Sequence, residues 1–521
     1  MTDAQRSRRT LSLAILGVTA VLSTVLLFAH LGTYALWDDE AETALGAQGI
    51  LSTGDTTAVL EHNFVARRAG INLKGLHDRV TPPLPSYLTA LSFFVGERDA
   101  FFARLPFALA GLAAVGLMLL YLWRRQVSVT CLVFAGLAIL TNVALFLYFR
   151  QCRYYGTSLL LVVATMFVYL EGLHTARRRV VLGILLGLLA LSHVLVCAQI
   201  CAALAVDWFV FERRATPFRR SWIWEIGVPF VIVAAPAVLV WNPMRVPSGA
   251  TIGALTIADR VRLLWLNVRD LFRGEFFPLA FVVYAPLAYA ITRRRWFLRG
   301  GAALLVILGV TAALSYQPVT PDTDADVRYV IAVIPIGIAL TTSSFTLLFE
   351  NRRWGVPIAL PLLLVSVVSG RPRSVPLSWY AELLNPIEEP YTPVASWLRR
   401  NVPARASVLV FPDYMMYPLM FHAPDPTYAW QLEPDGRFAG QFAPINYKTL
   451  EAPDYVIAFG FSTDAQDALR ALGATQHAQY KLVQVIDTHA GTVYRPEIFW
   501  RDFHTVQPHD LNDKVVILMR R

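Results

Sequence analysis

The chain is poor in charge: charged residues make up only 16% of its 521 positions, whereas hydrophobic residues make up 55%. This balance excludes an ordinary soluble enzyme of several domains and is typical of a protein that crosses a membrane many times. All four cysteines lie in or beside apolar runs, so neither a disulfide framework nor the spacing of a zinc site is visible. The chain also lacks a glycine-rich phosphate loop, internal repeats and low-complexity segments.

What the chain has instead is a series of long apolar runs. A helix needs roughly 20 apolar residues to cross the hydrocarbon core of a bilayer. The sequence therefore predicts a polytopic α-helical membrane protein. About eleven transmembrane helices are expected, at residues 11–30, 103–123, 127–148, 157–174, 180–192, 195–211, 222–241, 276–292, 302–317, 330–349 and 355–370.

Arginines gather at every second connection between these runs, and the positive-inside rule places such connections in the cytoplasm. The six clusters are Arg6–Arg9, Arg124–Arg125, Arg177–Arg179, Arg213–Arg220, Arg293–Arg299 and Arg352–Arg353. We expect a multi-pass protein of the plasma (inner) membrane, with its N-terminus cytoplasmic and the other connections outside. The net charge of +9 serves as membrane anchoring, so no nucleic-acid partner is expected.

After residue 370 the composition becomes that of a soluble protein. Buried strands are expected at 407–411, 454–459, 480–486 and 514–519, with helices at 392–401 and 464–472 between them. We therefore expect a transmembrane module at 1–370 and an extracytoplasmic α/β domain at 371–521. Because this domain would follow the last span on the outer side, we expect it to position an acceptor.

The longest outer connection, residues 31–102, begins with a cluster of acids. Asp38, Asp39, Glu40 and Glu42 directly follow the first apolar run. Carboxylates at a helix start complement the helix dipole by about 0.3–1 kcal/mol each. One acid would be enough for that role, and four repel each other, so we favour a functional cluster over helix capping alone.

The same connection carries further polar residues. Residues 41–51 are expected to form a short amphipathic helix along the membrane surface. Lys74, His77 and Asp78 precede "TPPLPSY" (81–87), whose prolines stiffen the chain before the next span. This stretch could hold polar groups in a fixed place, or it could simply end the loop.

Arginines and tyrosines occur at two other outer connections. Arg150, Arg153 and Tyr154 lie between the third and fourth expected spans, and Arg328 precedes the tenth. An arginine at hydrocarbon depth costs about 2.5–3.5 kcal/mol, which calls for a partner. An anionic lipid headgroup or an acid at 38–42 would serve. A structural salt bridge, or snorkelling for Arg328, remains an alternative.

At these residues the chain resembles the GT-C glycosyltransferases, in the protein O-mannosyltransferase and aminoarabinose transferase branch (family 39 type). The matching stretches are "DE" at 39–40, "HDRVTPPL" at 77–84, "FARLPFALAGL" at 102–112, "RYY" at 153–155, "GILLGLLALSH" at 183–193 and "RYVIAVIP" at 328–335. One difference stands out: Thr81 occupies the place where the mannosyltransferase pattern has a histidine before the proline pair.

The resemblance implies a GT-C fold, a polyprenyl-phosphate sugar donor, and transfer with inversion to a lipid, glycan or protein acceptor. It implies Asp39 as the general base, with Glu40 as a second catalytic residue. Arg153 would contact the donor phosphate, with Lys74 or Arg328. Further site candidates are Asp38, His77, Asp78, Tyr154 and Arg150. No cofactor is expected, although the acid cluster could hold a divalent metal.

Two other classes of protein remain open. A transporter or flippase of lipid-linked or anionic substrates would also carry intramembrane charges, but its site would lie near the bilayer midplane. Here the charges gather at one surface. A non-catalytic membrane scaffold with a soluble recognition domain is the second alternative.

Overall fold

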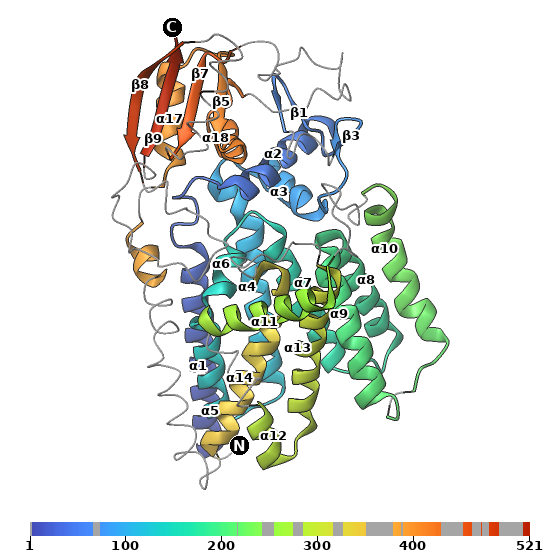
Figure 1. Ribbon diagram of the computed structural model, residues 1–521. Coiled ribbons are helices and arrows are strands. Elements are labelled where there is room, and N and C mark those ends of the chain that lie inside the picture. Colours follow the sequence, from blue (N-terminus) through green and yellow to red (C-terminus); the bar gives the residue numbers. More distant parts are fainter. Residues whose placement is uncertain are drawn as a thin grey trace.

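The structure is a computed structural model of the chain. It describes residues 3–65, 73–215, 217–241, 255–274, 285–315, 327–350, 379–386, 389–428, 452–460, 470, 479–488 and 514–521. Figure 1 shows a helical bundle with the N-terminus at one end. At the other end lie the first outer connection and a β-sheet that contains the C-terminus.

Apart from the charged helix α11 (Ile257–Gly274), which the sequence analysis did not predict, the bundle follows the apolar runs of the sequence. Its helices are α1 (Asp3–Phe28), α4 (Ala100–Arg124), α5 (Val129–Leu140), α6 (Val143–Phe149), α7 (Tyr154–Leu170), α8 (Ala176–Ser192), α9 (Val194–Asp207), α10 (Val228–Leu239), α11 (Ile257–Gly274), α12 (Ala285–Thr292), α13 (Arg295–Leu314) and α14 (Val333–Glu350). Short π-helical turns, η2 (Trp208–Glu212) and η3 (Ile223–Gly227), extend α9 and precede α10.

Among the described residues, four helices are long and apolar enough to cross a membrane, and a bent pair raises this number to five. The chain is thus a helical membrane protein. The total of about eleven spans remains a prediction. The run at 355–370 lies outside the described residues, and the run at 276–292 is described only from residue 285.

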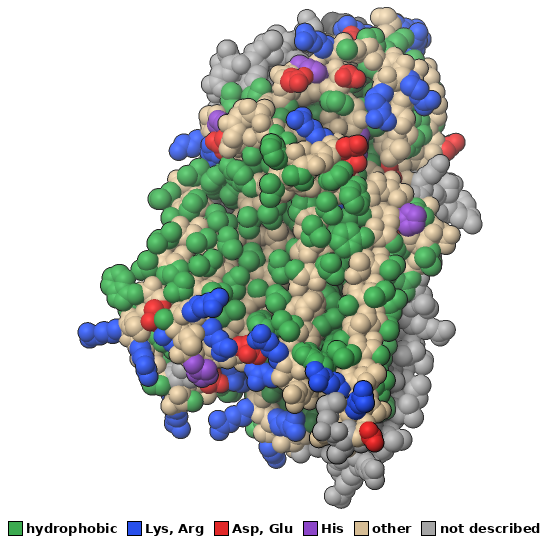
Figure 2. Space-filling model, turned by 180° about the vertical axis from the view of Figure 1, so that it is seen from behind, with side chains coloured by type: hydrophobic (Ala, Val, Ile, Leu, Met, Phe, Trp, Pro, Cys, Tyr) green, Lys and Arg blue, Asp and Glu red, His purple; other side chains and the backbone are tan. Residues whose placement is uncertain are grey.

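The arginine clusters that were expected at every second connection make contacts at one end of the bundle. These contacts are Arg9 over the Trp123 ring (5.7 Å), Arg124, Arg125 and Arg178 around Glu171 (3.8–3.9 Å), Arg179 with Glu225, and Arg299 with Asp207 and Glu212. Figure 2 shows basic side chains gathered at this end, below a broad apolar band. Arginines of four of the six predicted clusters therefore share one end. The cluster at 213–220 directly follows Glu212 there, and the cluster at 352–353 lies outside the described residues. The compartment that this end faces remains a prediction.

The run at 127–148 forms two helices with a short break between them. α5 and α6 meet at a bend of 57°. The Asn142 side chain accepts a hydrogen bond from the Leu145 N–H (2.9 Å) and so begins α6, a role for which asparagine is well suited. The bend brings the end of α6 into the core.

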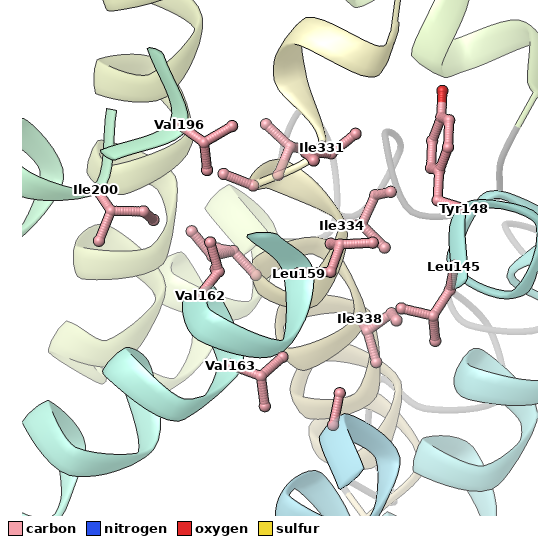
Figure 3. Close-up of a cluster of buried hydrophobic side chains, with 14 of the residues drawn as sticks. Leu145, Tyr148, Leu159, Val162, Val163, Val196, Ile200, Ile331, Ile334 and Ile338 are labelled. Carbon is pink, nitrogen blue, oxygen red and sulfur yellow. The ribbon is translucent and has the colours of Figure 1, made fainter. Parts of the chain in front are cut away.

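That core joins α6, α7, α9 and α14. Figure 3 shows Leu145, Leu159, Val196 and Ile334, one from each of these helices, pointing toward one another. Tight packing here fixes two connections, at 150–153 and at 327–330, relative to each other.

The Gly183 and Gly187 pair of α8 gives the close packing that its spacing predicts. A Cβ atom at Gly183 would lie 2.3 Å from the carbonyl oxygen of Ile226, and one at Gly187 would lie 2.6 Å from Cβ of Val233. The small residues therefore let α8 approach η3 and α10.

The first outer connection folds into helices and hairpins. Its elements are α2 (Asp38–Thr53), the hairpins β1 (Val59–Leu60) with β2 (Asn63–Phe64) and β3 (Leu73–Lys74) with β4 (His77–Asp78), and α3 (Leu84–Val95). The helix predicted at 41–51 is present as part of α2, but its expected place as an amphipathic helix on the surface is wrong. α2 is buried between α3 and α18 (Met416–His422), because its small residues let neighbours approach on several sides.

The C-terminal region contains the predicted strands. β5 (Ser407–Phe411), β6 (Thr427–Tyr428), β7 (Tyr455–Phe459), β8 (Tyr480–Asp487) and β9 (Lys514–Arg520) form one sheet in the order β6-β5-β7-β9-β8. β5 is parallel to β6 and β7, and β9 is antiparallel to β7 and β8. The predicted helix at 392–401 is α17 (Tyr391–Asn401). The helix expected at 464–472 and the boundary at 370 lie outside the described residues, apart from residue 470, so the division into two domains remains a prediction.

The sheet region shares a hydrophobic core with the first outer connection. Leu45 of α2 and Phe93 of α3 belong to the same cluster as Val394 of α17 and Leu419 of α18. Phe93 stacks on Phe421 with a ring-centroid distance of 6.0 Å. The acidic helix α2 is therefore covered by the C-terminal region.

Candidate functional site

A buried, irregular segment leads from α1 to the acidic helix. Ala35, Leu36 and Trp37 are at most 4% exposed, yet no helix or strand pairs their backbone. Arg104 of α4 supplies donors: it donates to the carbonyl oxygens of Leu31 (3.0 Å), Tyr34 (2.8 Å) and Ala35 (2.9 Å). Buried backbone groups need such partners.

Arg104 also forms a buried ion pair with Glu40. Its Nε donates to Oε1 (2.9 Å) and its Nη2 to Oε2 (2.6 Å). The Cys152 N–H donates to Oε1 (2.7 Å) and the Trp37 N–H to Oε2 (3.4 Å). Glu40 is 0% exposed, and both of its oxygens are engaged. This geometry gives Glu40 a structural role and does not favour the expected catalytic one.

Sequence reasoning missed the role of Arg104. The residue lies in the stretch "FARLPFALAGL", and it is the only charge in α4 before Arg124. An arginine just inside the start of an apolar run was a signal that this side chain has a polar partner nearby. The sequence does not say which residue is that partner.

Asp39 lies at the centre of the site, between two guanidinium groups. Its Oδ1 is 2.9 Å from Nη2 of Arg153, and its Oδ2 is 3.4 Å from Nη1 of Arg328. The Asp39 side chain is 4% exposed, whereas that of Arg328 is 24% exposed. Three segments far apart in the sequence therefore meet: the start of α2, the turn before α7, and the 3-10 turn at Val327–Val330.

Arg153 is held by more than Asp39. Its Nη1 donates to the Asp39 carbonyl oxygen (3.1 Å) and to Oγ1 of Thr43 (3.2 Å), and it lies 3.5 Å from Oε2 of Glu42. The guanidinium also lies 5.5 Å from the ring centre of Tyr154. The candidate Tyr154 is thus part of the site. Glu42 is also part of the site, and its place in the acid cluster was the sequence signal for it.

A small cavity of about 40 Å³ lies beside Arg153. Glu42 and Asp78 line it, together with hydroxyl groups such as those of Thr43 and Ser86. Burial and the nearby Glu42 carboxylate raise the pKa of Asp78. Asp78 in turn accepts hydrogen bonds from the backbone N–H groups of residues 80 and 81 (2.9 and 3.0 Å). Asp78 is therefore next to the site and stiffens the loop that carries it.

Two predicted residues of the loop lie elsewhere. Lys74 is exposed on the β3–β4 hairpin and does not line the cavity. His77 lies 3.5 Å from Asp55, which also accepts two hydrogen bonds from Arg79 (2.8 and 2.5 Å). The Arg79 guanidinium lowers the pKa of Asp55 to about 2. His77 and Asp55 thus belong to a cluster with Arg79 that stabilises the hairpins. The prediction for His77 failed because the local sequence cannot tell whether its partner is Asp55 or Asp39.

Arg150 and Asp38 also have structural partners. Arg150 donates to the carbonyl oxygens of Leu26 and Leu27 (2.9 and 3.0 Å) at the end of α1. Asp38 accepts the N–H of Asp39 (2.8 Å) at the start of α2. The site candidates that converge are therefore Asp39, Arg153, Arg328, Tyr154 and Asp78.

No group of three or more His, Cys, Asp or Glu side chains in the described part of the chain is arranged to hold a metal ion. The expectation that no metal or other cofactor is needed remains a prediction.

Comparison with solved structures finds the same fold in two kinds of protein. ArnT from Cupriavidus metallidurans bound to undecaprenyl phosphate matches with a TM-score of 0.55 and 14% identity, over 97% of this chain and 97% of that chain. Its apo state matches with a TM-score of 0.55 and 15% identity over the same shares. The apo oligosaccharyltransferase from Archaeoglobus fulgidus matches with a TM-score of 0.52 and 13% identity, over 94% of this chain and 71% of that chain.

No protein-family model and no curated protein sequence matches the chain. The structural likeness confirms the GT-C fold that the sequence resemblance predicted.

Replacing Arg104 tests the buried ion pair. Arg104→Ala should lower the free energy of unfolding by about 3–5 kcal/mol, because the buried Glu40 carboxyl would lose its counter-charge and its main hydrogen-bond donor. The measurement is thermal unfolding of the purified protein in detergent. Arg98→Ala, at an exposed position of the same connection, is the control and should unfold as the wild type does. An unchanged midpoint for Arg104→Ala would contradict the structural role of the pair.

Proposed function

We propose that the protein is a membrane glycosyltransferase that moves a sugar from a polyprenyl-phosphate donor to an extracytoplasmic acceptor with inversion. One observation carries the proposal: the Asp39 carboxylate lies between Arg153 and Arg328 at one end of the bundle. The GT-C fold supports it, since ArnT, which has this fold, has been solved with undecaprenyl phosphate.

In this reaction Asp39 acts as the general base. An acceptor hydroxyl attacks C1 of the donor sugar and gives its proton to the Asp39 carboxylate. The bond between C1 and the phosphate oxygen breaks, and its electron pair leaves with the polyprenyl phosphate. General base catalysis contributes about 10²–10⁴-fold to such a step.

The two arginines have different parts in this proposal. Arg328 is the more exposed of the two, so it is the first contact for the lipid phosphate. Arg153 is already bound to Asp39 and Glu42, and it orients the base while adding positive charge at the leaving group. Charge-assisted hydrogen bonds of this kind stabilise the negative charge that develops on the departing phosphate.

The position of the site in the bundle indicates the side of the membrane on which the reaction takes place. It lies at the end of the bundle opposite the arginine clusters, which belong in the cytoplasm if the positive-inside rule holds here. The reaction would then take place on the outer face of the plasma membrane. A transporter is the less suitable alternative, because the charges lie at a bundle end and not near the midplane.

Asp39→Asn tests the base. The variant should lose about 10²–10⁴-fold in kcat, because an amide cannot accept the proton. Wild type is first offered a panel of purified polyprenyl-phosphate sugars with extracted acceptors, and mass spectrometry identifies the donor it consumes. Turnover of that donor is then compared with Glu97→Gln, an exposed acid of the same connection, which should behave as wild type does. Full turnover by a folded Asp39→Asn would remove Asp39 from this role.

Arg328→Ala tests the phosphate contact. A hydrogen bond to a charged group is worth about 1.5–3 kcal/mol, so Kd for undecaprenyl phosphate should rise about tenfold to a hundredfold. Binding is measured with the lipid phosphate in detergent micelles, and Arg98→Ala serves as the control. Equal Kd values for the two variants would show that Arg328 does not hold the phosphate.

A further inference from the structure

Two side chains of the C-terminal region hold the backbone just before Asp39. The Leu36 N–H donates to Nε2 of His422 (3.0 Å), and the Ala35 N–H donates to Oε1 of Glu389 (3.4 Å). These contacts join positions more than 350 residues apart in the sequence. They come from the end of α18 and from the start of α17.

Both acceptors are set in place by their own surroundings. Glu389 is 4% exposed and also accepts the N–H groups of Tyr391 (2.6 Å) and Thr392 (2.9 Å) at the start of α17. His422 can accept at Nε2 only as a neutral ring with its proton on Nδ1. Burial, with the guanidinium groups of Arg104 and Arg399, lowers the pKa of His422 to about 4, so the ring is neutral near pH 7.

The segment is thus held from both sides. Arg104, from the transmembrane bundle, binds the carbonyl oxygens of Tyr34 and Ala35. His422 and Glu389, from the C-terminal region, bind the N–H groups of Leu36 and Ala35. The segment ends at Trp37, whose carbonyl oxygen accepts the Ala41 N–H (2.8 Å) in the first hydrogen bond of α2.

We propose that His422 and Glu389 are positioning residues: the C-terminal region fixes the segment that sets the place of Asp39. The inference rests on the proposed function, in which Asp39 is the base. It gives the C-terminal region a part in the reaction that differs from the expected positioning of an acceptor. A misplacement of about 1 Å at a reacting group can cost about 10²-fold in rate.

A pair of substitutions at one position separates this role from mere packing. In His422→Gln, the side-chain amide oxygen reaches the place of Nε2 and can accept the Leu36 N–H. In His422→Asn, the amide reaches only as far as Nδ1, so the acceptor is lost. The Gln variant is therefore the matched control, and Lys481→Gln, at an exposed position of β8, is a second one.

The expected result is a fall in kcat without a change in donor binding. His422→Asn should lose about tenfold to a hundredfold in kcat, with KM for the lipid-linked donor unchanged, while His422→Gln keeps at least a third of the wild-type kcat. Equal kcat values for the two variants would overturn the proposal. If His422→Asn does not fold, His422→Phe keeps a ring without an acceptor and is measured in its place. Failure of both to fold, while His422→Gln folds, would make His422 a folding residue and also overturn the positioning role.

Hydrogen exchange at the Leu36 amide separates this proposal from the proposed function. Exchange should be at least tenfold faster in His422→Asn than in His422→Gln. Faster exchange with unchanged transfer overturns the positioning role alone. If the wild type transfers no sugar from any polyprenyl phosphate, the proposed function fails, and the positioning role that rests on it fails too. Equal exchange in the two variants means that His422 does not hold the segment.

Discussion

The site depends on the buried ion pair between Arg104 and Glu40. It joins a transmembrane helix, α4, to the first turn of α2, and the same guanidinium satisfies the carbonyl oxygens of the segment between them. Both charges lose their hydration when they are buried, so burying either one without the other would strongly destabilise the fold. The pair therefore fixes one geometry of the chain where α1 ends and the acidic helix begins. Asp39, next to Glu40, takes its position from this pair.

Around Asp39 the charges balance. Two carboxylates, of Asp39 and Glu42, face two guanidinium groups, of Arg153 and Arg328. A balanced cluster can be buried at the edge of a bilayer, because each group has a partner in a medium that hydrates it poorly. A lipid phosphate would bring further negative charge, and Arg328, which is the more exposed guanidinium, lies where that charge can be met. The site thus combines a stable resting state with a place for an anion.

The sequence predicted the helices and strands better than the contacts between them. Apolar runs and alternating arginines indicated the helices and the shared end of the clusters, since hydropathy and positive charge are local properties. The meeting of residues 39, 153 and 328 followed from the same alternation. The pairing of Glu40 with Arg104 could not be predicted, because a buried ion pair between a loop and an apolar helix has no local pattern. The burial of α2 was missed for the same reason: the helices that cover it come from distant parts of the chain.

The shared core of α2 and the C-terminal region has a consequence for biosynthesis. Residues 35–53 leave the ribosome first, whereas α17, α18 and the sheet that complete their surroundings are made some 350 residues later. Domains form in the order of synthesis where they can, but this core combines the first outer segment with the last. The acidic helix therefore lacks α18, its C-terminal cover, while the whole bundle is inserted, although α3 is made directly after it. A ribosome that stops before residue 389 leaves a membrane-inserted chain whose acidic helix lacks the cover that α18 provides.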